Sequence, residues 1–205
     1  MNQSKVLFIL GNGPSLEQIF NNSNYLKILK QQHTFGLNAA YREFPKYDFQ
    51  PTYYGCFDYV LNDSHRHKFE QLILGKNQIK EFYFIGNRSQ KQNCFSDQVK
   101  KHPKFKNFTF IPNNPEKVTH LSTNLNHLYD MGISAANAVQ IGILKGYKTI
   151  ILLGCDSNYT EQIPEADWFN EKTKTLIMKK NPVNNPNYWF KEYQLSGDKF
   201  NLPQV

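Results

Sequence analysis

Residues 11–15, Gly-Asn-Gly-Pro-Ser, follow a short apolar run and have the composition of an anion-binding turn. The two glycines permit close backbone approach to a ligand, and the proline suits the first turn of a helix. Backbone N–H groups at such a helix N-terminus attract phosphate. No Gly-Lys-Ser/Thr follows, and a leucine replaces the third glycine of the dinucleotide fingerprint. The turn predicts a phosphate or polar ligand, with a plain tight turn as the alternative. The binding residues predicted here are Gly11, Asn12, Gly13 and Ser15.

Polar side chains also follow the other apolar runs. Asn38 ends the run HTFGLN, Asp58 follows TYYGCF, and Asp156 follows TIILLGC. Ser134 begins an alanine-rich segment directly after a glycine. Because the carboxyl ends of parallel strands meet at one edge of a sheet, we expect these side chains to lie near residues 11–15. Each of them alone is also explained as a turn former or a helix cap.

Short apolar segments are predicted to form the strands that position these residues. They are rich in β-branched or aromatic residues and mostly precede Gly, Asn or Asp, which is typical of parallel strands buried on both faces. The segments are residues 6–10, 33–38, 52–57, 81–86 and 149–155, with a weaker sixth at 108–111.

Helical segments alternate with these strands. We expect helices over residues 16–31, 64–75 and 134–145, the last with an apolar face that ends at Gly146. Strand–helix alternation predicts an α/β fold, a Rossmann-like and mostly parallel sheet flanked by helices, over residues 1–160.

The C-terminal residues differ in composition from this core. Four of the ten prolines and both tryptophans follow residue 155. We expect residues 161–205 to form a lid-like excursion of the same domain, over the carboxyl edge of the sheet.

The totals exclude several classes of protein. No apolar run reaches the roughly 18 residues that span a bilayer, and the N-terminus lacks a secretory pattern, so a cytoplasmic location is expected. Cys56, Cys94 and Cys155 form no CxxC pair, which argues against a zinc knuckle or a disulfide framework.

The net charge of +7 indicates an anionic partner or ligand. Basic residues cluster over 100–106 and 172–180, where solvated faces, an anionic inner-membrane surface or a phosphorylated ligand each account for them. The chain lacks an Arg-rich tract and an RNA-binding motif, so nucleic acid is not an expected partner.

Three stretches together resemble one superfamily. GNGPSL, TFGLN and GISAANAVQIGILKGYKTIILLGCD are similar to bacterial CMP-sialic-acid-dependent sialyltransferases of glycosyltransferase family forty-two, to related lipopolysaccharide and capsule transferases, and to MptE-like pterin diphosphokinases. The resemblance covers residues 5–60 and 125–160, and the middle matches in pattern only. It implies transfer of a sugar from a nucleotide-activated donor, a CMP-linked acidic sugar such as sialic acid, to a cell-surface glycan.

The resemblance also implies roles for individual residues. Asn12 would contact the phosphate and ribose of the donor, Asn38 its cytidine nucleotide, and Ser134 the donor as well. Gly154, in the matching GCD stretch, is counted with the binding residues. Asp58 is placed with them as well.

The catalytic residues match less well. The sialyltransferases carry a catalytic histidine in the excursion, whereas this chain has none between Asp156 and Val205. Their phosphate-stabilising tyrosines correspond to Tyr159, displaced by one position, and Tyr188 in the excursion is a second candidate. The predicted catalytic residues are thus Asp156, Tyr159 and Tyr188. The segment NPNYWFKEYQLSGDKFNLP resembles the lipopolysaccharide and capsule relatives, where it continues further, so a truncated chain is expected.

A CMP-sugar has a single phosphate, which N–H groups and tyrosine hydroxyls can stabilise without a metal. The sequence contains no DxD or His/Asp cluster, so an inverting, metal-independent transferase with no required cofactor is expected. Asp156 is the first candidate for the base, and Asp58, His120 and His127 are others.

Two alternatives stay open. One is a pterin-type diphosphokinase with ATP and Mg²⁺, which would gather acidic ligands around Asp58 and Asp156. The other is a non-catalytic nucleotide-sugar-binding domain.

Overall fold

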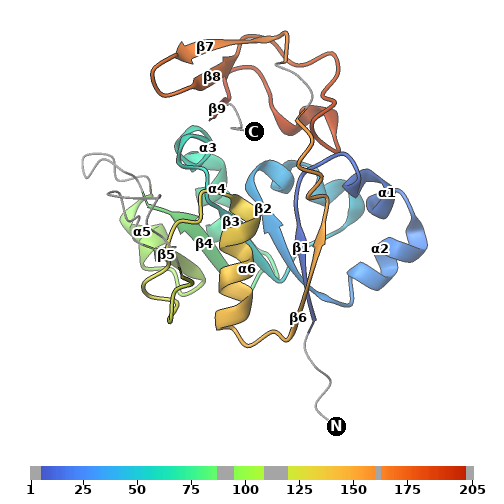
Figure 1. Cartoon of the computed structure of the whole chain (residues 1–205), viewed down its shortest axis with the longest axis vertical. Coiled ribbons are helices and arrows are strands. Elements are labelled where there is room, and N and C mark those ends of the chain that lie inside the picture. The colour runs from blue at the N-terminus through green and yellow to red at the C-terminus, as the bar shows by residue number, and fades with distance from the viewer. Residues whose placement is uncertain (1–5, 87–94, 109–119, 160–162, 202–205) are drawn as a thin grey trace.

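The computed structural model describes residues 6–86, 95–108, 120–159 and 163–201 and contains a six-stranded parallel sheet (Figure 1). The predicted α/β, Rossmann-like fold is therefore confirmed. The strands lie in the order β5-β4-β3-β2-β1-β6. They are β1 (Val6–Leu10), β2 (His33–Leu37), β3 (Tyr53–Cys56), β4 (Glu81–Ile85), β5 (Phe105–Phe108) and β6 (Thr149–Leu153).

This order reverses beside the first strand. The chain adds β2 to β5 successively on one side of β1, then returns through helix α6 (Ser134–Leu144) and places β6 on the other side. In open α/β sheets, ligands bind at the carboxyl ends of strands near such a reversal. The turn at 11–15 and the residues after β6 both lie at this point.

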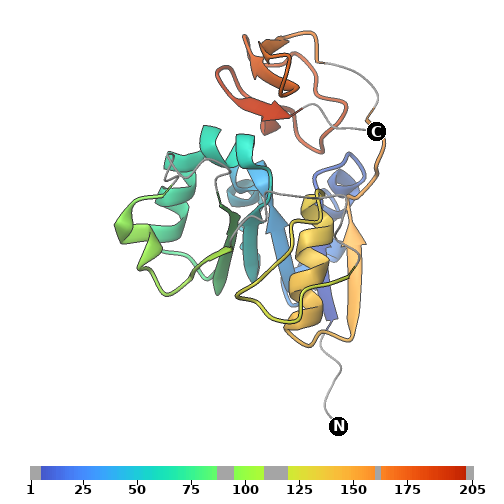
Figure 2. The ribbon, with the colours of Figure 1, turned by 60° about the vertical axis from the view of Figure 1, so that its left-hand side comes forward.

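Helices cover the two faces of the sheet (Figure 2). Alternate residues of each strand point to opposite faces, so Leu7 and Ile9 pack with α6, whereas Leu10 packs on the other face. That other face is covered by α1 (Leu16–Phe20), α2 (Ser23–Leu29), η1 (Asn38–Arg42), η2 (Phe44–Tyr47), α3 (Tyr59–Ser64), α4 (Arg66–Leu74) and α5 (Asp97–Lys100).

Several predicted boundaries were wrong. The helix expected over residues 16–31 is two helices. The side chain of Asn22 accepts hydrogen bonds from the backbone N–H groups of Asn24 and Tyr25 and so caps the start of a second helix, α2. The helix expected over 64–75 begins at Arg66 and follows the separate α3. The weak strand expected at 108–111 lies at Phe105–Phe108, and residues 109–111 are outside the described residues.

The last strand of the sheet also differs from expectation. Its apolar run predicted a strand buried on both faces, but β6 pairs only with β1 and forms the edge of the sheet. Ile151 and Leu152 are 36% and 48% exposed.

The C-terminal part forms a second, antiparallel sheet of β7 (Ala166–Asn170), β8 (Thr175–Met178) and β9 (Lys199–Asn201). Both ribbon views place it above the carboxyl ends of the parallel strands (Figures 1 and 2). It has a small core of its own, in which Leu176 and Met178 pack with Phe200. In the described part of the chain, no helix is long and apolar enough to cross a membrane.

Residues 185–193, which we call the strap, connect this second sheet to the main core and end with η4 (Lys191–Tyr193). Trp189, Phe190 and Tyr193 are buried members of the main hydrophobic core. The Trp189 ring stacks on Phe20 of α1, with ring centroids 4.6 Å apart. The strap is therefore an integral part of the core rather than a detached cover.

A buried ionic cluster fixes the turn before β9. The guanidinium of Arg42 donates to the carboxylate of Asp198, with Nη2 3.0 Å from Oδ1, and to the carbonyl oxygen of Tyr193 at 3.0 Å. Nε2 of the buried His65 lies 3.1 Å from Asp198 Oδ1. Burial alone would raise the pKa of Asp198, but the hydrogen bonds and charges of His65 and Arg42 hold this pKa well below its usual range.

This cluster predicts acid-sensitive stability. A depressed folded-state pKa adds stability above the unfolded-state value of about 3.8, and this contribution is lost as the pH falls toward the folded-state value. We expect Asp198→Asn to lower the free energy of unfolding at pH 7 by about 3 kcal/mol, since it leaves the Arg42 charge without its buried partner. Urea unfolding between pH 7 and pH 3 should show the two proteins converging below pH 4.

The matched control is Asp97→Asn, which removes the partner of Lys100 in an exposed pair 3.8 Å long. Such a pair contributes less than about 1 kcal/mol. Equal losses for the two variants, or a pH-independent difference for Asp198→Asn, would contradict the role assigned to the cluster.

Candidate functional site

The glycine turn after β1 packs against the end of β6. Gly11 N–H donates to the carbonyl oxygen of Leu153 at 2.7 Å, and Gly13 N–H donates to that of Gly154 at 2.8 Å. A Cβ atom on Gly11 would lie 2.2 Å from the Gly154 oxygen, and one on Gly13 would lie 2.2 Å from Asp156 Oδ2. Close contact with other atoms of the chain therefore requires glycine at both positions. Gly154 has a φ of 64°, a conformation that favours glycine.

The N-terminus of α1 already carries an anion. Asp156 Oδ2 accepts a hydrogen bond from Ser15 N–H at 2.9 Å, and Oδ1 accepts a short one from the Ser15 hydroxyl. The carboxylate of the chain therefore occupies the donors at which the sequence predicted a phosphate. Asp156 lies at the rim as expected, with both oxygens engaged.

Asn12, Asn38 and Ser134 come from three distant segments and meet at the rim. Asn12 Nδ2 donates to the carbonyl oxygen of Leu37 at 3.1 Å, so its amide lies across the end of β2. The next residue, Asn38, has a φ of 56°, and its Nδ2 lies 3.3 Å from the Ser134 hydroxyl. Asn12 is only 9% exposed, and its Oδ1 has no partner within the described residues. It is a buried acceptor available to a ligand.

Ser134 opens helix α6 as its first helical residue. The N-cap is Ile133, whose side chain makes no cap, and the helix's own hydrogen bonding begins with Asn137 N–H to the Ile133 carbonyl oxygen at 3.0 Å. Ser134 is therefore not the N-cap that the structural alternative assumed. Among the described residues no side chain caps this helix. Its first-turn N–H groups and its dipole favour an anion beside Ser134 and Asn38.

Two buried polar residues that sequence reasoning missed hold the loop leading into α6. Asn137 Oδ1 accepts from Met131 N–H at 2.9 Å, and its Nδ2 donates to Asp130 at 3.1 Å. Gln140 Oε1 accepts from Ser122 N–H at 2.9 Å. Amides three positions apart on an otherwise apolar helix were the available signal. They fix the position of the helix N-terminus.

The structure brings together the two predicted catalytic tyrosines. The hydroxyl of Tyr159, which follows β6, is hydrogen-bonded to that of Tyr188 in the strap. Tyr188 in turn stacks on Tyr193, with ring centroids 3.7 Å apart. Burial raises the pKa of Tyr159 to about 12 and holds that of Tyr188 well above its usual value, and the charge of Asp58 acts in the same direction. Both phenols therefore remain proton donors at neutral pH.

Asp58 lies on the same side of the site as these tyrosines, after β3. It caps α3, where its Oδ1 accepts from Val60 N–H at 2.8 Å and from Leu61 N–H at 3.1 Å. Asn201 of β9 also donates to Oδ1, at 3.2 Å. Burial raises the pKa of this carboxyl.

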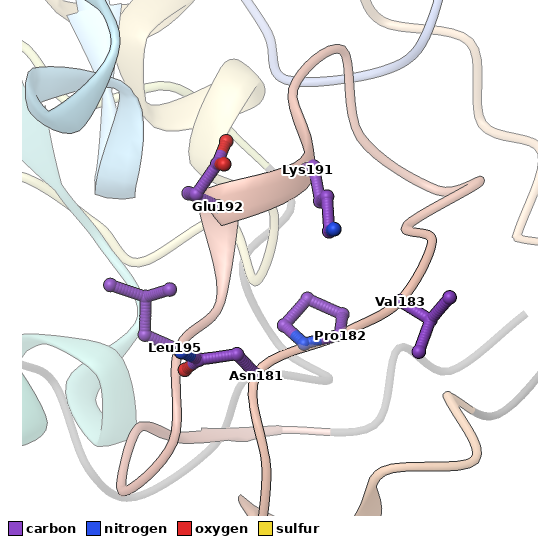
Figure 3. Close-up of a pocket in the computed structure, with 6 residues that line it drawn as sticks. All are labelled: Asn181, Pro182, Val183, Lys191, Glu192 and Leu195. Carbon is purple, nitrogen blue, oxygen red and sulfur yellow. The ribbon is translucent and has the colours of Figure 1, made fainter.

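Two hollows lie outside the group formed by Asn12, Asn38 and Ser134. One of about 550 Å³ is lined by Pro14, Ser15, Glu17, Gln18, Asp156, Asn158 and Pro186. The other, of about 310 Å³, lies in the C-terminal part and is lined by residues after β8 and around η4: Asn181, Pro182, Val183, Lys191, Glu192 and Leu195 (Figure 3). The first includes Ser15 and Asp156, and neither includes Asn12, Asn38 or Ser134.

Comparison of the chain with protein-family models, curated proteins and solved structures gave no match.

The strap predicts a strong dependence of stability on one tryptophan. Trp189 is 4% exposed, and its backbone N–H donates to the Asn12 carbonyl oxygen at 3.2 Å. We expect Trp189→Ala to lower the free energy of unfolding by about 3–5 kcal/mol, because it leaves a cavity against Phe20. Urea titration followed by circular dichroism measures the loss. Trp168→Ala is the control, since Trp168 is 38% exposed and should cost much less. A strap that closes only loosely over the core would give similar values for both.

Proposed function

We propose that this chain transfers a sugar from a nucleotide-activated donor, a CMP-linked acidic sugar such as sialic acid, to a glycan of the lipopolysaccharide or capsule class. The observation that carries the proposal is the meeting of Asn12, Asn38 and Ser134 at the uncapped N-terminus of α6. These are the residues that the resemblance assigns to the donor, and 96 positions separate Asn38 from Ser134.

In this proposal the donor phosphate lies at the α6 N-terminus. The Ser134 hydroxyl and the first-turn N–H groups are hydrogen-bond donors to its oxygens, and the helix dipole stabilises the charge that grows on the departing CMP. The amides of Asn12 and Asn38 contact the ribose and cytosine. Because this charge is met by fixed donors, the proposed reaction requires no metal and no cofactor.

The sugar then extends from β2 toward β3, beneath the second sheet. Tyr159 and Tyr188 lie at that end, beside Asp58, and donate hydrogen bonds to the sugar or to the incoming glycan. This differs from the phosphate contact that the sequence suggested for the tyrosines. The donor is cytoplasmic in this proposal, and the net charge of +7 supports a peripheral contact with an anionic inner-membrane surface.

The geometry supports the diphosphokinase alternative less well. Asp58 and Asp156, the two carboxylates around which Mg²⁺ ligands were expected, have separate sets of donors. Ser15 holds Asp156, while α3 and Asn201 hold Asp58.

Nucleotide binding tests the proposal. We expect CMP at about 100 times its Kd to raise the melting temperature by about 5–10 °C with or without EDTA, since a native-state ligand adds about 2.7 kcal/mol at that concentration. Ser134→Ala and Asn38→Gly should abolish most of the shift. Both changes suit the local backbone: alanine fits a first helical position, and glycine fits a φ of 56°. Scanning fluorimetry measures the shifts.

The matched control is Ser23→Ala, which removes a serine hydroxyl from the first position of α2, away from the rim. It should bind CMP like the wild type. Stabilisation by ATP with Mg²⁺ alone would favour the diphosphokinase. CMP binding without release of CMP from a CMP-sugar would favour the non-catalytic domain.

A further inference from the structure

Two neighbouring aromatic residues of β7 are exposed to solvent. Trp168 is 38% exposed and Phe169 is 54% exposed. β7 forms one border of the second sheet, in which the strand order is β7-β8-β9. At the opposite border β9 contacts α3, where Lys199 N–H donates to the Ser64 hydroxyl at 2.9 Å. Figure 1 shows β7 on the side of this sheet that is farther from the parallel strands, so the two rings lie at an outer border of the molecule.

A β-bulge in β7 places these two rings on opposite faces of the second sheet. The register with β8 shifts just after Trp168, which pairs with Leu176 of the small core and so lies on the core face. Phe169 lies on the other face, where the Lys199 ammonium is 3.8 Å from its ring centroid. Lys199 is on that face because the next residue, Phe200, points into the small core. The border of β7 thus presents one aromatic ring on each face of the sheet.

Four exposed lysines lie at the two ends of the β7–β8 hairpin: Lys172, Lys174, Lys179 and Lys180. Two of them are in the turn between the strands, and two follow β8. The salt bridges found among the described residues include none of the four. The acidic residues over the same stretch are fewer, namely Glu165, Asp167 and Glu171. The hairpin therefore combines exposed aromatic rings with an excess of positive charge.

An anionic bilayer matches this combination better than a protein strand does. Tryptophan is favoured at the boundary between lipid headgroups and acyl chains, where its ring is apolar and its N–H is hydrated. Lysine side chains reach the phosphates of anionic lipids from such a position. A protein that adds a strand to a sheet needs a regular row of backbone N–H and C=O groups, and the bulge interrupts that row in β7.

We propose that the β7–β8 hairpin docks this protein on an anionic bilayer, with both aromatic rings among the headgroups and the lysines against the lipid phosphates. The inference deepens the membrane contact of the proposed function and rests on that part of it alone. The second sheet lies above the carboxyl ends of the parallel strands (Figure 1). Docking through β7 therefore turns the candidate site toward the membrane, where a glycan linked to lipid is within reach.

Vesicles of phosphatidylcholine, and of equal parts phosphatidylcholine and phosphatidylglycerol, test the inference. The chain has two tryptophans and Trp189 is only 4% exposed, so a change in fluorescence reports on Trp168. We expect the mixed vesicles alone to sediment the chain and to shift its emission to shorter wavelength, because Trp168 leaves water. Trp168→Phe should still sediment but lose the shift. Lys172→Gln with Lys174→Gln should weaken binding to the mixed vesicles about 30-fold.

The matched control is Lys27→Gln with Lys76→Gln, which removes the same charge from two exposed lysines outside the second sheet. It should bind the mixed vesicles like the wild type. Equal losses in the two double variants, or sedimentation without the emission shift, would overturn the inference.

Absence of binding to either kind of vesicle would also overturn it and would leave a protein partner as the occupant of the β7 border. Each of these results would leave the CMP-dependent shift in melting temperature, and with it the proposed function, intact. A chain that binds the mixed vesicles but not CMP would overturn the proposed transferase and keep the docking surface.

Discussion

The contact between the glycine turn after β1 and the end of β6 is the constraint on which the site depends. Gly11 and Gly13 lie so close to Gly154 and Asp156 that a Cβ atom on either glycine would overlap them. The contact brings the two strands at the reversal of the sheet together and directs Asn12 across the end of β2. Asp156 fills the N-terminus of α1, so the uncapped N-terminus of α6 is the anion site that we propose at this rim.

The C-terminal residues complete the site by fixed contacts. The strap inserts Trp189 among the aromatic side chains of the main core and brings Tyr188 to Tyr159. The Arg42–Asp198–His65 cluster fixes the turn before β9, from which Asn201 reaches Asp58. The second sheet is thereby joined to the polar rim through charge and hydrogen bonding, whereas its own apolar core is small.

The sequence predicted what depends on local pattern. Short apolar runs placed the strands of the parallel sheet. Asn38, which ends one run, and Ser134, which begins the alanine-rich segment, were thereby expected at one rim, where the structure places both. The local pattern could not show that β6 is an edge strand, because the same apolar run is compatible with a central strand and with an edge strand. The helix break was missed because it rests on one cap, the side chain of Asn22.

Other features depend on contacts between distant segments. Ser15 and Asp156 are 141 positions apart, and no local signal shows that one holds the other. Residues 161–205, which include the strap, were expected to form a lid because of their prolines and tryptophans, yet the aromatic residues of the strap belong to the main core. The hydrogen bond that Asn201 of β9 donates to Asp58 likewise joins residues 143 positions apart.

The central claim is that the uncapped N-terminus of α6, with Asn12, Asn38 and Ser134, binds the nucleotide of the donor. A crystal structure of the chain with CMP tests it most directly. We predict the phosphate within hydrogen-bond distance of the Ser134 hydroxyl and the first N–H groups of α6, with the ribose or cytosine on Asn12 and Asn38. CMP bound instead in the hollow between α1 and Asp156, with the α6 N-terminus empty, would contradict the claim.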